Sequence, residues 1–224
     1  MKTLTFAKRC AKEILRDPIN LAFGLGFPLV LLLLLSIIQS NIPNNLFNIK
    51  SLAPGISVFG LSFITLFSAT LIAKDRETSF LQRLYTTPLK PINFILGYLL
   101  PLVPIALCQT AICFLAAIFL KLPININIIF AIIAMLPATV FYISLGLLCG
   151  SVLNSKQVGG ICGALLTNLS AWLSGIWFDL KLIGGFFEKI AKVLPFLHAV
   201  ELEKAIIYGE YSTIWSHPKE YLQG

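Results

Sequence analysis

Charged residues are scarce in this 224-residue chain. Asp, Glu, Lys and Arg make up 12% of it, against 57% hydrophobic residues, and the mean hydropathy is +0.87. A soluble domain usually carries about 25% charged residues, so the composition points to lipid as the surrounding solvent. Uncharged runs of about twenty residues can cross a bilayer as helices, whereas a membrane β-barrel would show alternating segments of about ten residues. We therefore predict an all-α, polytopic transmembrane helical bundle.

The chain also lacks the residue patterns of several catalytic and metal-binding sites. Its five cysteines form no CxxC pair, so neither a disulfide framework nor a metal cluster is predicted. The two histidines, His198 and His217, have no ligand partner at helical spacing. A GxxxxGK[ST] sequence is missing, so the chain has no P-loop of its own for ATP. We predict no catalytic residue, no metal and no cofactor bound by this chain.

Five apolar runs are long enough to span the membrane. Their cores contain no Asp, Glu, Lys, Arg or His, residues that within a membrane usually mark proton relays, ion paths or catalytic centres. This argues against a proton-coupled transporter and against an intramembrane enzyme. The predicted spans are Ile19–Ile38, Leu52–Ala73, Ile92–Leu120, Ile126–Leu148 and Val158–Phe178.

An amphipathic helix is predicted before the first span, over residues 2–17. Apolar residues recur there at helical spacing and cations occupy much of the rest, as in a helix that lies in the lipid headgroup layer. A plain positive-inside anchor is the compatible alternative. The apolar positions are Leu4, Ala7, Ala11, Ile14 and Leu15. The candidate membrane-interface residues are Lys8, Arg9, Lys12 and Arg16.

Lysine and arginine are unevenly distributed between the segments outside the spans. The N-terminal segment and the loops after the second and fourth spans together hold ten, whereas the two opposing loops hold only Lys50 and Lys121. Because cytoplasmic loops carry the excess of these residues, we expect the N-terminus in the cytoplasm. The net charge of +7 is explained in the same way, and no nucleic-acid partner is predicted. Residues 179–224 are then an external amphipathic segment and tail.

One charged stretch interrupts the apolar sequence, residues 74–90 (KDRETSFLQRLYTTPLK). Phe80, Leu81 and Leu84 share one edge of a predicted helix of two to three turns, which Pro88 ends. A simple connector needs only about four to six residues. An apolar edge with charges around it fits a cytoplasmic partner protein, and a helix lying flat on the membrane is the alternative.

Mild polar side chains lie inside two of the spans. Hydroxyl groups follow one stripe of the second span, and the fifth span adds an amide and an indole. They indicate either interhelical hydrogen bonds and close packing or the wall of a pathway for a largely apolar solute. The candidate pathway residues are Ser62, Thr65, Ser68, Asn168 and Trp172.

The charged stretch resembles the first cytoplasmic loop of the membrane (permease) subunits of ABC-2 type exporters. The loop pattern of that family, D/E-R-E-x-G-T-L-E-R-L-x-x-T-P, compares with DRETSFLQRLYTTP at residues 75–88. Supporting features in the same order are RDP at Arg16–Pro18, FP at Phe27–Pro28 and LPFLHAVE at Leu194–Glu201. The resemblance covers roughly residues 2–205.

The resemblance implies a coupling helix seated on a separate ABC ATP-binding subunit, which would bind the ATP and Mg²⁺. Two permeases, here a homodimer, and two ATPases would form an exporter in a bacterial cytoplasmic (inner) membrane. Its substrate would be hydrophobic or amphipathic: a drug, a lipid or a lipid-linked glycan. The implied coupling residues are Asp75, Arg76, Glu77, Phe80, Leu81, Arg83 and Leu84.

The chain departs from the family pattern in two respects. Ser79-Phe80 replaces the usual Gly-Thr and Gln82 replaces the usual Glu, which bears on how the loop docks. The family usually has six spans, and the sixth, expected after Leu194–Glu201, is missing here through truncation or an altered tail.

A non-transporting membrane scaffold that recruits a cytoplasmic partner is the alternative function, and a membrane-embedded enzyme is a third.

Overall fold

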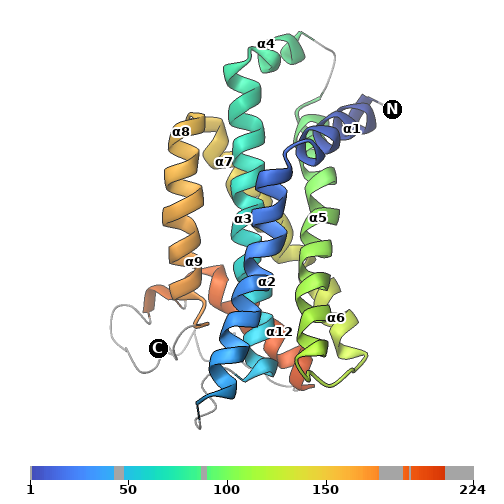
Figure 1. Ribbon diagram of the computed structural model, residues 1–224. Helices are drawn as coiled ribbons and strands as arrows, with labels where there is room; N and C mark the ends of the chain where they lie inside the picture. The colour runs from blue at the N-terminus through green and yellow to red at the C-terminus, as the bar shows by residue number, and fades with distance from the viewer. Residues whose placement is uncertain (1, 43–47, 87–89, 177–188, 192, 210–224) are drawn as a thin grey trace.

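The computed structural model describes residues 2–42, 48–86, 90–176, 189–191 and 193–209. Within these ranges the regular structure is helical, and long helices run side by side from one end of the molecule to the other (Figure 1). The predicted all-α membrane bundle is confirmed.

Four helical segments are long and apolar enough to cross a membrane. The fourth comprises two helices, α6 (Asn127–Ala134) and α7 (Leu136–Val152), which are separated at Met135, just before Pro137. Proline cannot continue the hydrogen bonds of the preceding turn, so a break at this position is expected. The other three are α2 (Pro18–Ser40), α3 (Ile49–Glu77) and α5 (Pro91–Phe119).

The fifth predicted span is largely covered by one further helical column, from Ser155 to Leu173. It consists of α8 (Ser155–Val158), a π-helical segment η1 (Gly159–Leu166) and α9 (Thr167–Leu173). The column stands beside α3 and α7 (Figure 1). The last residues predicted for this span, 177 and 178, lie outside the described residues.

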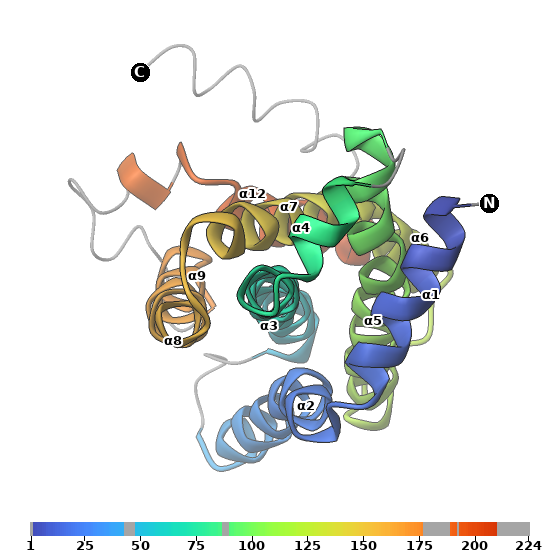
Figure 2. The same cartoon turned by 90° about the horizontal axis from the view of Figure 1, so that it is seen from above.

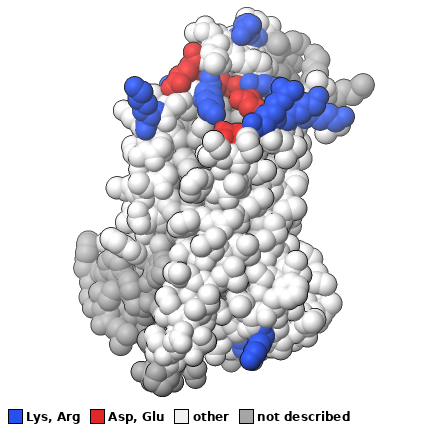
Figure 3. Space-filling view, in the orientation of Figure 1, with Lys and Arg blue, Asp and Glu red and all other residues white. Residues whose placement is uncertain are grey.

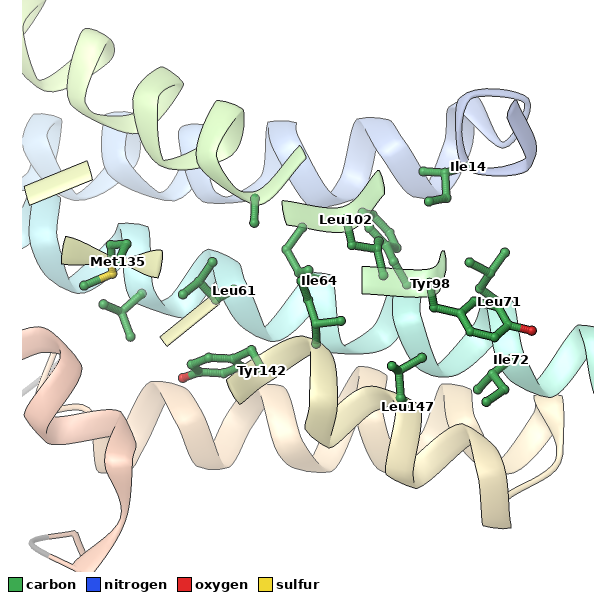
Figure 4. Close-up of a cluster of buried hydrophobic side chains, with 14 of the residues drawn as sticks. Ile14, Leu61, Ile64, Leu71, Ile72, Tyr98, Leu102, Met135, Tyr142 and Leu147 are labelled. Carbon is green, nitrogen blue, oxygen red and sulfur yellow. The ribbon is translucent and has the colours of Figure 1, made fainter. Parts of the chain in front are cut away.

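Helix α3 is the centre of the bundle. In the view from above, α2, α5, α7 and the α8–α9 column surround it (Figure 2). Of its most apolar stretch 89% is buried, compared with 22% for α2. Around α3 the core is apolar, with Leu61, Ile64 and Leu71 among side chains of the neighbouring helices (Figure 4).

Two glycines allow α3 and α7 to approach closely. A Cβ atom on Gly146 would lie 1.8 Å from Ser68 Oγ and 2.3 Å from the Thr65 carbonyl oxygen. A Cβ atom on Gly150 would lie 2.2 Å from the carbonyl oxygen of Ala69. The contact therefore has no room for side chains, which is how small residues bring membrane helices together.

The N-terminal helix α1 (Lys2–Leu15) packs mainly against α5, and its buried face differs from the predicted one. The structure buries Ala7 and Ile14 of the predicted face together with Phe6 and Cys10, whereas Leu4 and Leu15 are 57% and 64% exposed. Part of the reason lies in α5, where a Cβ atom on Gly97 would come within 2.1 Å of the Phe6 ring. Glycine leaves a notch there that phenylalanine fills, and periodicity in α1 alone cannot reveal this notch.

Two short helices lie at opposite ends of the bundle. Helix α4 (Phe80–Tyr85) follows α3 at the end where charged side chains gather (Figure 3), which we call the charged end. Helix α12 (Pro195–Tyr208) packs on α3 and α6 at the other end. Of the amphipathic helix predicted around residues 186–194, residues 186–188 and 192 lie outside the described residues.

The sequence predicted one helix within the charged stretch of residues 74–90, but the structure divides this stretch between two helices. Lys74–Glu77 form the last turn of α3, and the separate helix begins only at Phe80. Charged residues can continue a helix where it leaves the membrane, so the end of an apolar run does not locate the end of the helix.

Candidate functional site

Three consecutive charged residues end α3, and each bonds to a different element. Asp75 binds α1, Arg76 binds the end of α7, and Glu77 binds the start of α8. We call these three residues the DRE junction. Asp75 also accepts a hydrogen bond from Tyr98 of α5, so together they tie the central helix to four of its neighbours at the charged end.

Asp75 is the buried member of the junction, with an exposed fraction of 1%. Its two carboxylate oxygens accept hydrogen bonds from the Arg9 guanidinium, at 2.6 and 2.5 Å, and the Tyr98 hydroxyl donates a third at 2.7 Å. The hydrogen bond to Asp75 raises the pKa of Arg9 above its ordinary value, so Arg9 stays charged. A buried carboxylate is stable only when it is paired and hydrogen-bonded in this way.

Arg76 and Glu77 complement the ends of two helices. Arg76 Nη1 donates to the carbonyl oxygens of Gly150 and Leu153, at 2.9 and 3.1 Å, near the C-terminus of α7. The Glu77 carboxylate accepts from the backbone N–H and hydroxyl of Ser155, at 2.8 and 2.7 Å, at the N-terminus of α8. A cation at a helix C-terminus and an anion at an N-terminus are the favourable arrangement.

Aromatic side chains connect α4 to the same region. The Arg9 guanidinium lies 3.9 Å from the centre of the Phe80 ring, a cation–π contact. Phe6 of α1 stacks on Phe80 at 6.2 Å and on Phe94 of α5 at 5.9 Å between ring centres. Arg9, predicted to face the headgroup layer, therefore lies between the DRE junction and α4.

The apolar edge of α4 faces the bundle rather than a partner. Leu81 is only 6% exposed, and Phe80 and Leu84 pack against the main apolar cluster. The prediction that these residues are exposed for a partner is therefore wrong for Leu81. The outward surface of α4 carries Gln82 and Arg83 instead.

A comparison with known protein families identifies the family of this chain. The sequence profile of the ABC-2 type transporter family matches residues 1–208, from α1 to the end of α12. The chain belongs to the ABC-2 type transporter family. It is thus a transporter permease subunit and an integral membrane protein, and permeases of this family generally have an ABC ATP-binding partner. No curated protein and no solved structure gives a significant match to it.

The family pattern has glycine where this ABC-2 permease has Ser79, and the backbone explains why. Ser79 adopts a left-handed conformation, with φ of 57°, between α3 and α4. This conformation costs a residue with a side chain roughly 1–2 kcal/mol, whereas glycine adopts it readily. The turn that separates α4 from α3 is therefore kept at some cost in stability.

We expect Ser79→Gly to increase the free energy of unfolding by up to about 1 kcal/mol, because glycine relieves the left-handed strain. Thermal unfolding of the purified permease in detergent would measure it. Ser151→Gly, at an exposed position near the end of α7, is the matched control and should lower stability by up to about 0.5 kcal/mol, because glycine is the poorer helix former. Equal losses for both variants would contradict the strain at Ser79.

The predicted pathway residues fall into two separate places. Ser62, Thr65 and Ser68 are fully buried, and the last two donate to α7 carbonyl oxygens, Thr65 to Tyr142 at 2.9 Å and Ser68 to Ile143 at 3.1 Å. In this conformation they pack helices together. Asn168 and Trp172 instead lie on the exposed face of α9, so the five residues do not form one site.

An apolar groove of about 520 Å³ lies near the charged end of the ABC-2 permease, between α4, α5 and α7. The sequence prediction did not include it. Its lining includes Leu84 of α4 and Tyr98 of α5, so the groove adjoins both α4 and the residues around Asp75. Two hydroxyls, on Ser144 and Ser151, are the polar groups on its α7 side.

Sequence reasoning did not find the partner of Asp75, and it did not find Glu203 at all. The pairing of Asp75 with Arg9 joins residues 66 positions apart and leaves no local signal. Glu203 of α12 is fully buried, and its spacing from Phe196, Val200 and Ile206 places it on an apolar helical face, a signal that could have been found. Among the described residues, no three His, Cys, Asp or Glu side chains are grouped to hold a metal ion.

Proposed function

We propose that this ABC-2 permease forms the translocation pathway of an ATP-driven exporter and is coupled to a separate ATPase through α4. The observation that carries the proposal is the DRE junction, because it joins the end of the central helix to α1, α5, α7 and α8. Contacts of Phe80 with Arg9 and Phe6 add α4 to the same unit. A displacement of α4 by a partner would therefore pull on several helices at once.

The coupling residues have different roles in this proposal. Arg83 and Gln82, on the outward side of α4, would contact the ATPase. Phe80, Leu81 and Leu84 would hold α4 on the bundle. Asp75, Arg76 and Glu77 would pass its movement to the helices, since a partner alters a conformational equilibrium only through contacts that differ between the two states. ATP and Mg²⁺ would be bound by the ATPase.

The charge distribution supports a cytoplasmic position for the charged end. Charged side chains gather over the α1 and α4 end and are sparse on the surface between the two ends (Figure 3). Cytoplasmic segments carry the lysine and arginine excess, and an ATPase would approach from that side. Exposed cations on α1, among them Lys8, Lys12 and Arg16, would contact lipid headgroups.

A hydrophobic or amphipathic substrate fits the surfaces of this chain best. The groove between α4, α5 and α7 is mostly apolar with a few hydroxyls, a composition suited to a drug, a lipid or the lipid part of a lipid-linked glycan. Asn168 and Trp172 on the exposed face of α9 would meet a second permease copy, because polar side chains on membrane helices favour helix contacts over lipid.

Reconstitution of the permease with its ATPase in liposomes tests the coupling role. Arg83→Glu should reduce stimulated ATP hydrolysis and substrate export at least about tenfold, since like charges brought together at an interface cost several kcal/mol. The thermal stability of the variant should stay unchanged, because Arg83 is exposed.

Lys121→Glu, the same charge reversal at the other end of the bundle, is the matched control and should leave hydrolysis and export unchanged. Full export by Arg83→Glu would contradict coupling through α4. Binding of the ATPase without stimulated hydrolysis or export in the unmodified protein would favour the scaffold function instead.

A further inference from the structure

Helix α12 carries a glutamate on the face that it packs against the bundle. Glu203 is fully buried, as are Val200 and Ile206 one turn to either side of it. One of its carboxyl oxygens, Oε2, is hydrogen-bonded to the Ser57 hydroxyl of α3. The other, Oε1, has no hydrogen-bond partner among the described residues.

Counting hydrogens at Ser57 indicates which group supplies the proton of this bond. The Ser57 hydroxyl also lies 2.7 Å from the carbonyl oxygen of Pro54 in the preceding turn, an acceptor that has no hydrogen to give. A hydroxyl has a single hydrogen and two acceptor lone pairs. If Ser57 donates to Pro54, the bond to Glu203 requires a hydrogen on the carboxyl group. A protonated Glu203 satisfies both contacts.

The surroundings of Glu203 also favour the uncharged acid. Helices α6 and α9 contribute no charged residue in their described parts, and Cys113 is the titratable group that faces it from α5. On α3 the cation nearest to Ser57 in sequence is Lys50. Its Nζ lies 5.9 Å from the ring centre of Tyr208, which is more than one turn beyond Glu203 on α12.

The charged side chains next to Glu203 on α12 either contact another residue or are less buried than Glu203. Glu201 lies 3.6 Å from His198, and Lys204 is half-buried. Gln109 of α5 donates towards the Ser57 carbonyl oxygen at 3.5 Å, while its own side-chain oxygen lacks a partner among the described residues. Burial raises the pKa of Glu203 well above its ordinary value, and a carboxylate here would add charge beside an acceptor that is already unsatisfied.

We propose that Glu203 is a proton-binding site that fastens α12 to α3 and so closes the end of the bundle opposite the charged end. The closed state holds the proton more tightly than a state in which α12 is lifted into water. Closure is therefore favoured most at acidic pH. Each pH unit between the ordinary pKa of a glutamate and the raised pKa of the closed state favours opening by about tenfold, and above the raised pKa the effect levels off. The proposal concerns this chain alone and does not depend on coupling to an ATPase.

Cysteine labelling of the full chain in detergent tests the proposal. Cys113 is buried next to this site and becomes the probe when the other four cysteines are replaced by serine. Alkylation by a maleimide would be followed from about pH 5 to about pH 9, a range that begins just above the ordinary pKa of a glutamate. The same measurement on Glu203→Gln is the reference, since its amide can still donate to Ser57 but cannot lose a proton.

We expect the unmodified chain and Glu203→Gln to label equally slowly at low pH. Above the ordinary pKa of a glutamate the ratio of their rates should rise by about tenfold per pH unit, and it should level off above the raised pKa of the closed state. The pH dependence of the thiol itself cancels in this ratio. Glu201→Gln, which removes a more exposed carboxylate from the same helix, should label like the unmodified chain. A constant ratio across the range would overturn the proposal.

Ser57→Ala provides a second test whose sign distinguishes the two hydrogen-bond directions. If protonated Glu203 donates to Ser57, loss of the hydroxyl weakens the acid form of the closed state, and the pH at which opening levels off should move about one unit lower. If Ser57 instead donates to a carboxylate, that pH moves higher, which would contradict the proposal. This test remains valid even if Glu203→Gln does not fold.

Discussion

Arg9→Ala is expected to lower the free energy of unfolding by about 3 kcal/mol, because it leaves a buried carboxylate without its cation. Asp75 is 1% exposed and would keep only the hydrogen bond from Tyr98. The cation–π contact of Arg9 with Phe80 would be lost in the same variant, so α4 should loosen together with α1. Thermal unfolding in detergent would measure the loss of stability.

Two further variants define the origin of this loss. Lys12→Ala removes the same charge from an exposed position of α1 and should change stability by less than about 0.5 kcal/mol. Tyr98→Phe removes one hydrogen bond to Asp75 and should cost about 1–3 kcal/mol. If Arg9→Ala were no more destabilising than Lys12→Ala, Asp75 would not depend on Arg9.

The second large effect is expected at the contact of α3 with α7. Gly146→Leu should cost more than about 3 kcal/mol, at or above the upper end of overpacking costs, because a backbone carbonyl lies in the way. The Cβ atom alone would lie 2.3 Å from the Thr65 carbonyl oxygen. To make room, α7 must move away, and the hydrogen bonds that Thr65 and Ser68 donate to it would break.

The yield of monodisperse protein and its melting temperature in detergent would report this change. Gly160→Leu is the matched control, since a Cβ atom on Gly160 meets nothing within 4 Å. It should keep most of the stability of the unmodified chain. Similar losses of stability for both variants would contradict the prediction, because they would show that replacing glycine lowers stability without any clash with α3.

Composition predicted the membrane bundle because lipid imposes strict demands on a helix. A spanning segment must be long and almost uncharged, and α2, α3 and α5 meet both conditions over the predicted runs. The helix ends were less well predicted, because polar groups outside the hydrocarbon can continue a helix. The charged residues Lys74–Glu77 illustrate this, since they form the last turn of α3.

Partners across the bundle could not be predicted from one sequence. Periodicity showed that Phe80, Leu81 and Leu84 share an edge of α4, but not that this edge faces the bundle. The same limit applies to Arg9, whose position among other cations suggested lipid rather than Asp75. Glu203 was missed for a different reason: it lies outside the apolar runs, where buried charge was not expected.

The length of α3 has a mechanical consequence for the DRE junction. With 29 residues, α3 is about 43 Å long, whereas the hydrocarbon of a bilayer is about 30 Å thick. One end of α3 must therefore project beyond the hydrocarbon, and the charges in its last turn make that the Glu77 end. Over this length, a tilt of about 10° about the far end displaces the last turn by about 7 Å. The last turn, which moves furthest in such a tilt, is bonded to α1, α5, α7 and α8.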